Sequence, residues 1–222
     1  MSAQLVGGTR RPQGARDRAV IRRLASRLAG AGISPNRISQ AGLLAGILSG
    51  ACLWIGGRLG QPALLLLGAI LIGLRLLANL LDGLVAIEGG RAAPDGPFWN
   101  EVPDRLSDAA ILVGAGLAVG EPALGWAAAA LAILTAYLRE AGVSLGLPPD
   151  FRGPFAKPQR MAGIAAGAIL AAFLLILNTS HAPSAFSAAL WLVTLGTALT
   201  ALRRALTLRA ALITRGRDPD AD

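Results

Sequence analysis

The sequence has little of what soluble, secreted or nucleic-acid-binding proteins need. Only 15% of its 222 residues are charged, 5% are aromatic, and there is one cysteine and one histidine. Soluble domains carry about a quarter charged residues, so an ordinary soluble globule and a disordered chain are both disfavoured. Cys52 alone cannot form an internal disulfide, which excludes a disulfide scaffold. The arginines flank long uncharged runs, so we expect no nucleic acid as a partner.

What the sequence does have is apolar length. Hydrophobic residues make up 54% of it, and the mean hydropathy is +0.56. A membrane-spanning helix needs about 20 mostly apolar residues. The sequence therefore predicts an all-α integral membrane protein with six transmembrane helices. They fall at residues 38–57, 59–87, 101–120, 122–140 and 161–202, the last run being long enough for two spans with a turn-rich break at 178–184.

The charge of the loops predicts the orientation of these spans. The net charge is +8, and basic residues gather before the first span, after the last, and in the loops that follow spans two and four. Basic loops stay on the cytoplasmic side. We therefore expect both termini and the active site to face the cytoplasm at a bacterial inner membrane, with anionic membrane lipids as partners. A cleavable signal peptide is not expected, because the first 35 residues lack an apolar core segment.

Residues 15–30 predict a separate N-terminal element. Val20, Ile21, Leu24 and Leu28 recur at helical spacing, and arginines occupy the rest of the wheel. This pattern is typical of an amphipathic juxtamembrane helix on an anionic surface; the alternative is that these arginines only fix the topology. We expect residues 1–222 to form one membrane domain, with this surface helix followed by the six-span bundle at 36–212.

Polar side chains interrupt the second and third predicted spans near their cytoplasmic ends. Asn79 and Asp82 are three residues apart, and Asn100, Asp104 and Asp108 follow one another at intervals of four, so each set shares one helix face. Ionisable groups inside a membrane are costly and usually functional. Because a short loop joins the two spans, we expect them to pack as a hairpin with their polar faces together.

Carboxylates gathered in this way would repel one another or take up protons unless a cation joined them. Carboxylate and amide oxygens favour Mg²⁺, Mn²⁺ or Ca²⁺ over zinc. The one histidine, His181, is expected on the opposite side of the membrane. The alternative is that the acids merely pair with Arg75, Arg105 and Arg139.

The same residues resemble the motif of the CDP-alcohol phosphotransferases, D-x2-D-G-x2-A-R-x8-G-x3-D-x3-D. The stretch from Asn79 to Asp104 fits this pattern without a gap. The predicted layout, a basic amphipathic helix before six spans, extends the resemblance to most of the chain. The residues that correspond to the motif are Asn79, Asp82, Gly83, Ala86, Gly96, Asn100 and Asp104.

The chain departs from the motif at three positions. Asn79 and Asn100 stand where the first and third Asp are expected, and Ile87 stands where the Arg is expected, with Arg91 four residues later. In a second register, an insertion of four residues would make Asp104 and then Asp108 the closing pair of acids. We prefer the ungapped register, which leaves two acids of four.

The resemblance implies an enzyme of phospholipid biosynthesis that is a homodimer. It would transfer a phosphatidyl group from a CDP-linked lipid, CDP-diacylglycerol, to a small polar alcohol acceptor with release of CMP, using one or two Mg²⁺ or Mn²⁺ ions. Asp104 would be the base that accepts the hydroxyl proton. The metal ligands would be Asn79, Asp82, Asn100, Asp104 and Asp108, and the donor would contact Gly83, Ala86 and Arg91.

A second basic group predicts where an acceptor that carries a phosphate would bind. Arg139 ends span four, and Arg152, Lys157 and Arg160 follow in the next loop. This loop loosely resembles the acceptor side of phosphatidylglycerophosphate and phosphatidylinositol phosphate synthases; the alternative is a purely topological role. Two other functions remain open: a catalytically impaired relative with a structural role, and a cation or proton transporter that uses the buried acids.

Overall fold

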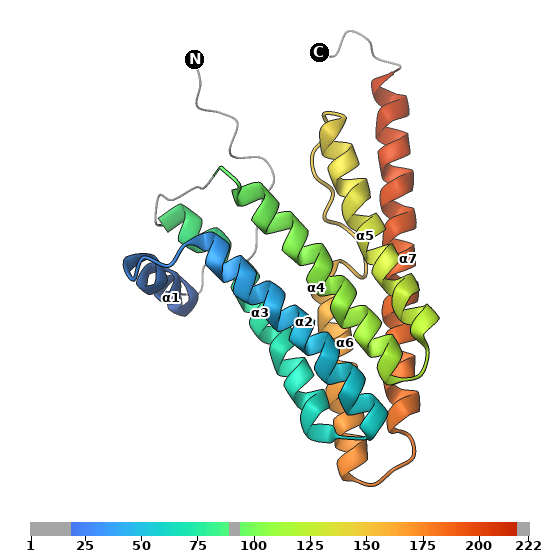
Figure 1. Cartoon of the computed structure of the whole chain (residues 1–222). Coiled ribbons are helices and arrows are strands. Elements are labelled where there is room, and N and C mark those ends of the chain that lie inside the picture. The colour runs from blue at the N-terminus through green and yellow to red at the C-terminus, as the bar shows by residue number, and fades with distance from the viewer. Residues whose placement is uncertain (1–18, 89–93, 217–222) are drawn as a thin grey trace.

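The structure is a computed structural model that describes residues 19–88 and 94–216. Arg91 and the first residues of the predicted surface helix lie outside these ranges. The described chain is helical throughout its regular structure (Figure 1). Its helices are α1 (Ala19–Gly30), α2 (Pro35–Leu59), α3 (Pro62–Glu88), α4 (Gly96–Ala118), α5 (Pro122–Ser144), α6 (Lys157–Ile176) and α7 (Ala182–Arg215).

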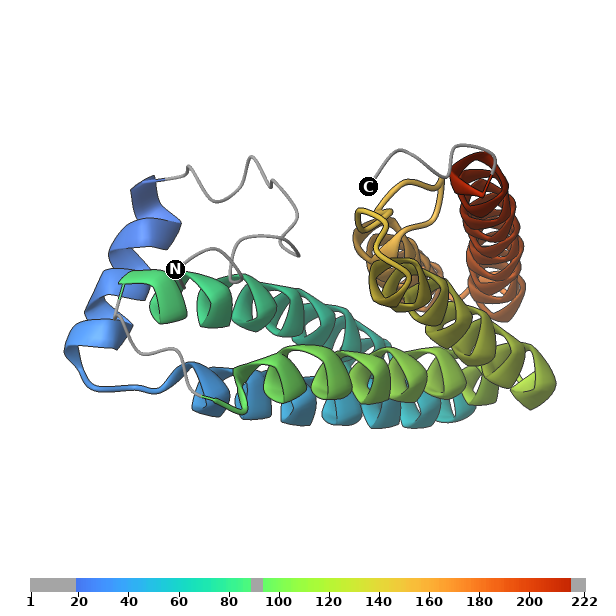
Figure 2. The same cartoon turned by 90° about the horizontal axis from the view of Figure 1, so that it is seen from above.

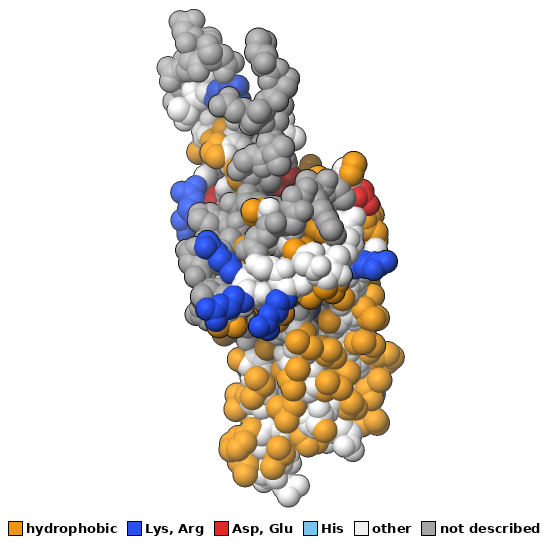
Figure 3. All heavy atoms as spheres, turned by 90° about the vertical axis from the view of Figure 1, so that its left-hand side faces the viewer, with side chains coloured by type: hydrophobic (Ala, Val, Ile, Leu, Met, Phe, Trp, Pro, Cys, Tyr) orange, Lys and Arg blue, Asp and Glu red, His pale blue; other side chains and the backbone are white. Residues whose placement is uncertain are grey.

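Five of these helices, α2, α3, α5, α6 and α7, are long and apolar enough to cross a membrane. Hydrophobic side chains cover the lower part of the face shown in Figure 3, while Lys and Arg side chains gather above it. An integral membrane protein is therefore supported. With 23 residues α4 is long enough to span as well, but its first half carries several charges. The sixth span and the cytoplasmic orientation stay predictions.

The helix boundaries follow from local sequence signals. The Ser34 hydroxyl accepts a hydrogen bond from the Arg37 amide and caps α2, which begins with Pro35. Gly60 ends the same helix in the left-handed conformation, with φ of 61°. The other long helices after α3 likewise have a proline in their first turn. The helices therefore extend beyond the uncharged runs that predicted them.

The N-terminal helix α1 packs against α3 rather than lying free. Ala25 is completely buried, and Ile21 and Leu28 are partly buried beside it. Val20 and Leu24 point outward and are exposed. The helix predicted at residues 15–30 thus exists from Ala19 onward, but its apolar residues divide between a face against α3 and an outer face. Its contact with a lipid surface stays a prediction.

The prediction that α3 and α4 pack directly as a hairpin is not what the structure shows. Helix α2 packs along both of them, and α3 and α4 face each other mainly through polar side chains. Glycines on α2 permit this arrangement: a Cβ atom on Gly46 would lie 2.5 Å from the Ser107 Cβ, and one on Gly50 would lie 2.3 Å from the Ala110 carbonyl oxygen. Close packing at small residues is common between membrane helices.

The bundle has a closed end and an open end. At the closed end, short turns join α4 to α5 and α6 to α7, and Glu121 in the first turn accepts hydrogen bonds from Ser187 and Trp191 of α7. At the open end, α3 and α5 finish and α4 and α6 begin. Figures 1 and 2 show that α5 and α7 diverge there from the group formed by α2, α3 and α4. Helix α6 packs against both α3 and α7.

Candidate functional site

A cluster of ion pairs joins α3 to α4 near the open end. Arg75 of α3 is only 1% exposed, and its Nη2 lies 2.9 Å from Asp104 Oδ1 and 2.7 Å from Asp108 Oδ1 of α4. The same nitrogen donates to the Asp104 carbonyl oxygen at 3.1 Å. One buried guanidinium therefore holds both carboxylates in place, since a charge buried in this way requires an opposite charge.

Helix α6 completes the cluster with two more cations. Lys157 Nζ pairs with Asp104 Oδ2, and Arg160 Nη2 donates to Asp108 Oδ2 at 2.8 Å. Each of the two carboxylates of α4 is thus held by one cation from α3 and one from α6. The sequence predicted that Lys157 and Arg160 would bind the acceptor's phosphate, but the structure directs both side chains to the acids.

Asp82 lies apart from these ion pairs. Ser39 of α2 donates a hydrogen bond of 2.7 Å to its Oδ2. Its Oδ1 is buried and has no hydrogen-bond partner among the described residues. Sequence reasoning missed Ser39, because an isolated serine in an apolar run reads as a packing residue. Like Arg75 Nη1, Asp108 Oδ1 and Arg160 Nε, this carboxylate oxygen is a buried polar atom that a ligand could satisfy.

Asn79 lies between Asp104 and Lys157, and its amide can be placed in two orientations. In one, it donates to Asp104 Oδ1 at 3.0 Å and accepts from Lys157 Nζ at 2.9 Å. In the other, oxygen would face oxygen at Asp104 and nitrogen would face nitrogen at Lys157, so only the first orientation satisfies both contacts.

A small polar cavity opens between these side chains, with a volume of about 10 Å³. Roughly 10–15 Å³ is the room that one water needs. Within the described residues, no group of three or more His, Cys, Asp or Glu side chains could hold a metal. The oxygen groups at the cavity are the Asp82 and Asp104 carboxylates and the Asn79 amide, and these could hold one divalent ion. The lining residues include Ser39, Gly42, Arg75, Asn79, Asp82, Trp99, Pro103, Asp104 and Ser107.

The acids of the two motif registers differ in their position relative to the cavity. Asp82 and Asp104 both line it, whereas Asp108 is one turn deeper and lies between two arginines. Because Asp104 belongs to both registers, the choice between them stays a prediction. Asn100 is not brought to the cavity: it is exposed at the start of α4, and its amide donates to Glu101 at 3.3 Å. Its predicted role as a ligand gains no support from its position.

The predicted donor contacts lie beyond the cavity on α3. Gly83 and Ala86 are partly buried in the last turns of that helix, toward the open end. They are not among the residues that line the cavity. Their place, between the acids and the open end, is compatible with a donor that approaches along α3.

The remaining basic residues of the predicted acceptor group lie around the loop between α5 and α6. The Arg139 guanidinium lies 2.8 Å from Glu101 Oε2 and stands over the Phe151 ring at 5.4 Å from its centre. Arg152 is exposed and pairs with Asp150 at 3.0 Å. These two arginines flank the same aromatic ring, apart from the pairs of Lys157 and Arg160.

Two polar contacts outside the predicted set stabilise the surroundings. Asn36 of α2 donates to Asp95 at 2.9 Å, and this amide holds the pKa of the Asp95 carboxyl below its usual range. Arg204 of α7 is buried and donates to the carbonyl oxygens of Thr135 and Arg152 at 2.7 and 3.1 Å. The sequence presented Arg204 as one of many topology-setting arginines, and no local signal distinguished it.

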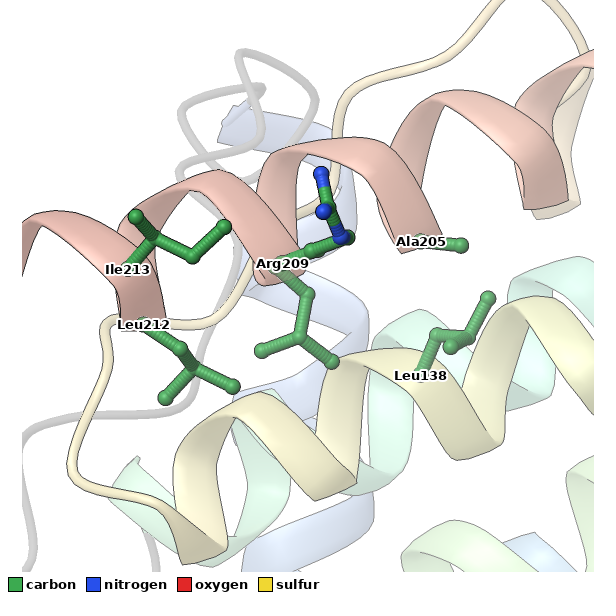
Figure 4. A pocket seen from close by; sticks show the side chains of 6 residues that line it. Leu138, Ala205, Arg209, Leu212 and Ile213 are labelled. Atoms are coloured by element: carbon green, nitrogen blue, oxygen red, sulfur yellow. The ribbon is translucent and has the colours of Figure 1, made fainter.

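Larger grooves exist, but they lack the chemistry of the polar cavity. One, of about 580 Å³, lies between α5 and α7 and is lined by apolar side chains and Arg209 (Figure 4). Another, of about 650 Å³, lies beside α7 near Gly153 and Arg203. Neither is lined by a carboxylate. The small cavity is therefore the candidate site.

Comparison with known proteins agrees with the motif. No family model matches the chain. The archaetidylinositol phosphate synthase of Aeropyrum pernix is 35% identical over 125 residues, which are 56% of this chain and 63% of that protein. The phosphatidylinositol phosphate synthase of Mycolicibacterium smegmatis is 26% identical over 189 residues, 82% of this chain and 80% of that protein. The chain is thus similar to inositol phosphate synthases, in agreement with the resemblance of its motif to the CDP-alcohol phosphotransferases.

The fold of the chain has a counterpart among solved structures. The crystal structure of Mycobacterium tuberculosis phosphatidylinositol phosphate synthase with CDP-DAG bound matches with a TM-score of 0.71 at 22% identity, covering 85% of this chain and 93% of that one. A second structure of the same protein, in complex with manganese and citrate, also has a TM-score of 0.71. At this identity, the likeness concerns the fold.

Proposed function

We propose that this chain transfers a phosphatidyl group from CDP-diacylglycerol to a phosphorylated polar alcohol and releases CMP, as a step in phospholipid synthesis. The observation that carries the proposal is the cavity in which Asp82, Asn79 and Asp104 converge. Both relatives described above are inositol phosphate synthases by name. We further propose the cytoplasmic orientation and the homodimer that the sequence and the resemblance predict.

The chain's own residues divide the work of binding and proton transfer. The acceptor hydroxyl attacks the β-phosphorus of the donor, and the bond to the CMP oxygen breaks. We assign the hydroxyl proton to Asp104, which lines the cavity one turn inside α4. A base has to lie within hydrogen-bond reach of its proton. Arg75 and Lys157 hold the Asp104 carboxylate in a fixed orientation.

One Mg²⁺ or Mn²⁺ ion suits the ligands present. Asp82 would supply its unpartnered oxygen, with Asn79 and Asp104 as further oxygen ligands. When bound, the ion polarises the pyrophosphate and neutralises charge on the leaving CMP. The protein keeps Asp82 aimed at this point through Ser39, whose hydrogen bond fixes the other carboxylate oxygen.

We propose that Arg139 and Arg152 receive the phosphate of the acceptor. They flank Phe151 at the open end, and Arg152 is well exposed. A guanidinium can bind a phosphate through two parallel hydrogen bonds. Lys157 and Arg160 were predicted for this role too; their pairing with Asp104 and Asp108 supports a part in holding the acids, and their phosphate role stays a prediction.

The direct test is CMP release by the purified chain in lipid nanodiscs that contain CDP-diacylglycerol. We expect release with inositol phosphate and little with inositol, glycerol phosphate or no acceptor. EDTA should abolish the reaction, and Mn²⁺ or Mg²⁺ should restore it. Release that does not depend on any acceptor would show hydrolysis instead of transfer.

A catalytically impaired relative is the second candidate. It is favoured by Asn79 and Asn100 in place of motif acids, and by the engagement of both Asp104 oxygens with cations. This candidate predicts donor binding without CMP release for every acceptor in the panel. The transporter alternative gains nothing from the comparisons, and the ion-paired groups lie toward one end of the bundle.

A further inference from the structure

We propose that this site works with a single divalent ion, and that Lys157 and Arg75 supply the positive charge that a second ion would bring. This inference rests on the proposed function. Two-metal sites stabilise the attacking and the leaving oxygens with one ion each, about 3.5–4 Å apart. In this chain, protein cations already stand beside one of the two carboxylates at the cavity.

The charge balance of the cluster leaves no place for two ions. Three carboxylates, Asp82, Asp104 and Asp108, face three cations, Arg75, Lys157 and Arg160. Their formal charges cancel. Two divalent ions would add four positive charges to a buried neutral cluster, and burying unpaired charge is expensive. One ion together with the negative pyrophosphate of the donor restores the balance.

The geometry assigns different partners to the two carboxylates of the cavity. Both oxygens of Asp104 are engaged by Arg75 and Lys157, whereas Asp82 keeps one buried oxygen without a partner in the described chain. An ion can reach this Asp82 oxygen without breaking an ion pair of the cluster. A further ion bound beyond Asp104 would have to displace Lys157.

Both protein cations have reason to stay in place. Arg75 is 1% exposed and reaches two carboxylates, and Arg160, three residues after Lys157, fixes the start of α6 through Asp108. Positive charge that is already oriented costs no reorganisation during the reaction. Arg75 Nη1 is also buried, lacks a hydrogen-bond partner among the described residues and belongs to a side chain that lines the cavity. That N–H is available to a phosphate oxygen.

The neutral amide of Asn79 is also consistent with a site for a single divalent ion. It contacts both Asp104 and Lys157, so an aspartate there would add negative charge beside the ammonium. An amide can offer its oxygen to one ion without attracting a second. Asn79 and Lys157 therefore act together to limit the site to one ion, and Asn79 is not merely a lost metal ligand.

The test counts bound Mn²⁺ ions by electron paramagnetic resonance on the full chain in nanodiscs with CDP-diacylglycerol. We expect one ion per chain in the wild type. The double variant Asn79→Asp, Lys157→Met restores a carboxylate and removes the ammonium, so it should bind two ions with a spin-coupled spectrum. Its matched control, Asn79→Asp, Lys157→Arg, keeps the positive charge and should bind one.

Two ions on the wild-type chain, or none, would overturn the proposal, and so would the same count in both double variants. Thermal unfolding of each variant shows that the compared proteins are folded. Arg58→Gln, at the closed end of α2, controls for the general loss of a cation and should leave one ion. Because ions are counted without turnover, this result stands apart from the CMP assay that tests the proposed function.

Discussion

Arg75 is the residue on which the polar cluster depends. It is a fully buried guanidinium in the middle of a largely apolar helix, and it bridges two carboxylates of the neighbouring helix. Breaking a buried ion pair by removing one partner costs about 3–5 kcal/mol, because the other charge is left uncompensated. The two aspartates that it holds should therefore respond differently to neutralisation.

We expect Asp108→Asn to destabilise the protein, because it leaves Arg75 and Arg160 facing each other without a full carboxylate charge. Asp104→Asn removes a partly exposed carboxylate and should instead lower CMP release by about 10²-fold or more with donor binding largely intact. Thermal unfolding and turnover of both variants separate the two effects. If Asp108→Asn folds normally and abolishes turnover, Asp108 is the base and the gapped register is correct.

Asn79 gives a second prediction, about metal affinity. A carboxamide offers an oxygen but no charge, so the wild type should bind Mn²⁺ weakly alone and much more tightly with CDP-diacylglycerol, whose phosphates bring charge and ligands. Asn79→Asp should tighten binding without donor. Calorimetric titration of both proteins, with and without donor, measures this; equal affinities without donor would show that the amide is no handicap.

At the level of the elements, α2 is the helix that sets the distance between α3 and α4. Its glycines let the backbones of α2 and α4 approach so closely that a Cβ atom on Gly114 would lie 2.2 Å from the Gly50 carbonyl oxygen. This contact fixes the depth of α4, and hence of Asp104, relative to Asp82.

We expect Gly50→Ala to lower the stability by about 1–3 kcal/mol, because its methyl group would meet the backbone of Ala110 and not a flexible side chain. Gly73→Ala on α3 is the matched control, since nothing lies within 4 Å of its Cβ position. Thermal unfolding in detergent should show a lower melting temperature for the first variant and an unchanged or higher one for the second.

The loop between α5 and α6 is the element that we assign to acceptor binding. Arg152→Gln should raise the acceptor KM more than the donor KM, because the side chain is exposed and pairs only locally, with Asp150. Initial rates measured against each substrate in turn decide this. Equal increases in both constants would place the loop at the donor or give it a topological role.

For the whole molecule, the topology can be tested directly. In a Cys52→Ser background, Ser180→Cys in the turn at the closed end should be labelled from the periplasm by a membrane-impermeant maleimide. Ser144→Cys at the open end should be labelled only after the cells are opened. Both side chains are exposed. Labelling of Ser180→Cys only in opened cells would contradict six spans with cytoplasmic termini.

Features that depend on local sequence could be predicted, and contacts between distant segments could not. Apolar runs predicted the long helices, because crossing a membrane is a local requirement of length and composition. The spacing of polar residues within each helix predicted that Asp82 and Asp104 share a site, since the position along a helix determines the face on which a side chain lies. The pairing of Lys157 with Asp104 was not predicted, because it depends on how α6 packs against α3. The meeting of the polar faces of α3 and α4 was predicted, but the packing of α2 along both helices was not, because it depends on close contacts between distant segments.

The closed end around Glu121 has a mechanical consequence. Helix α5 starts there and contains 23 residues, so it is about 34 Å long at 1.5 Å per residue. A tilt of about 3° around its fixed start moves its far end by roughly 2 Å, and moves Arg139, which lies before that end, by somewhat less. The helix would pivot about the Glu121 contact. Since membrane helices tilt to match the thickness of the bilayer, we expect the chain length of the lipids to set the separation, at the open end, between α5 and the group formed by α2, α3 and α4.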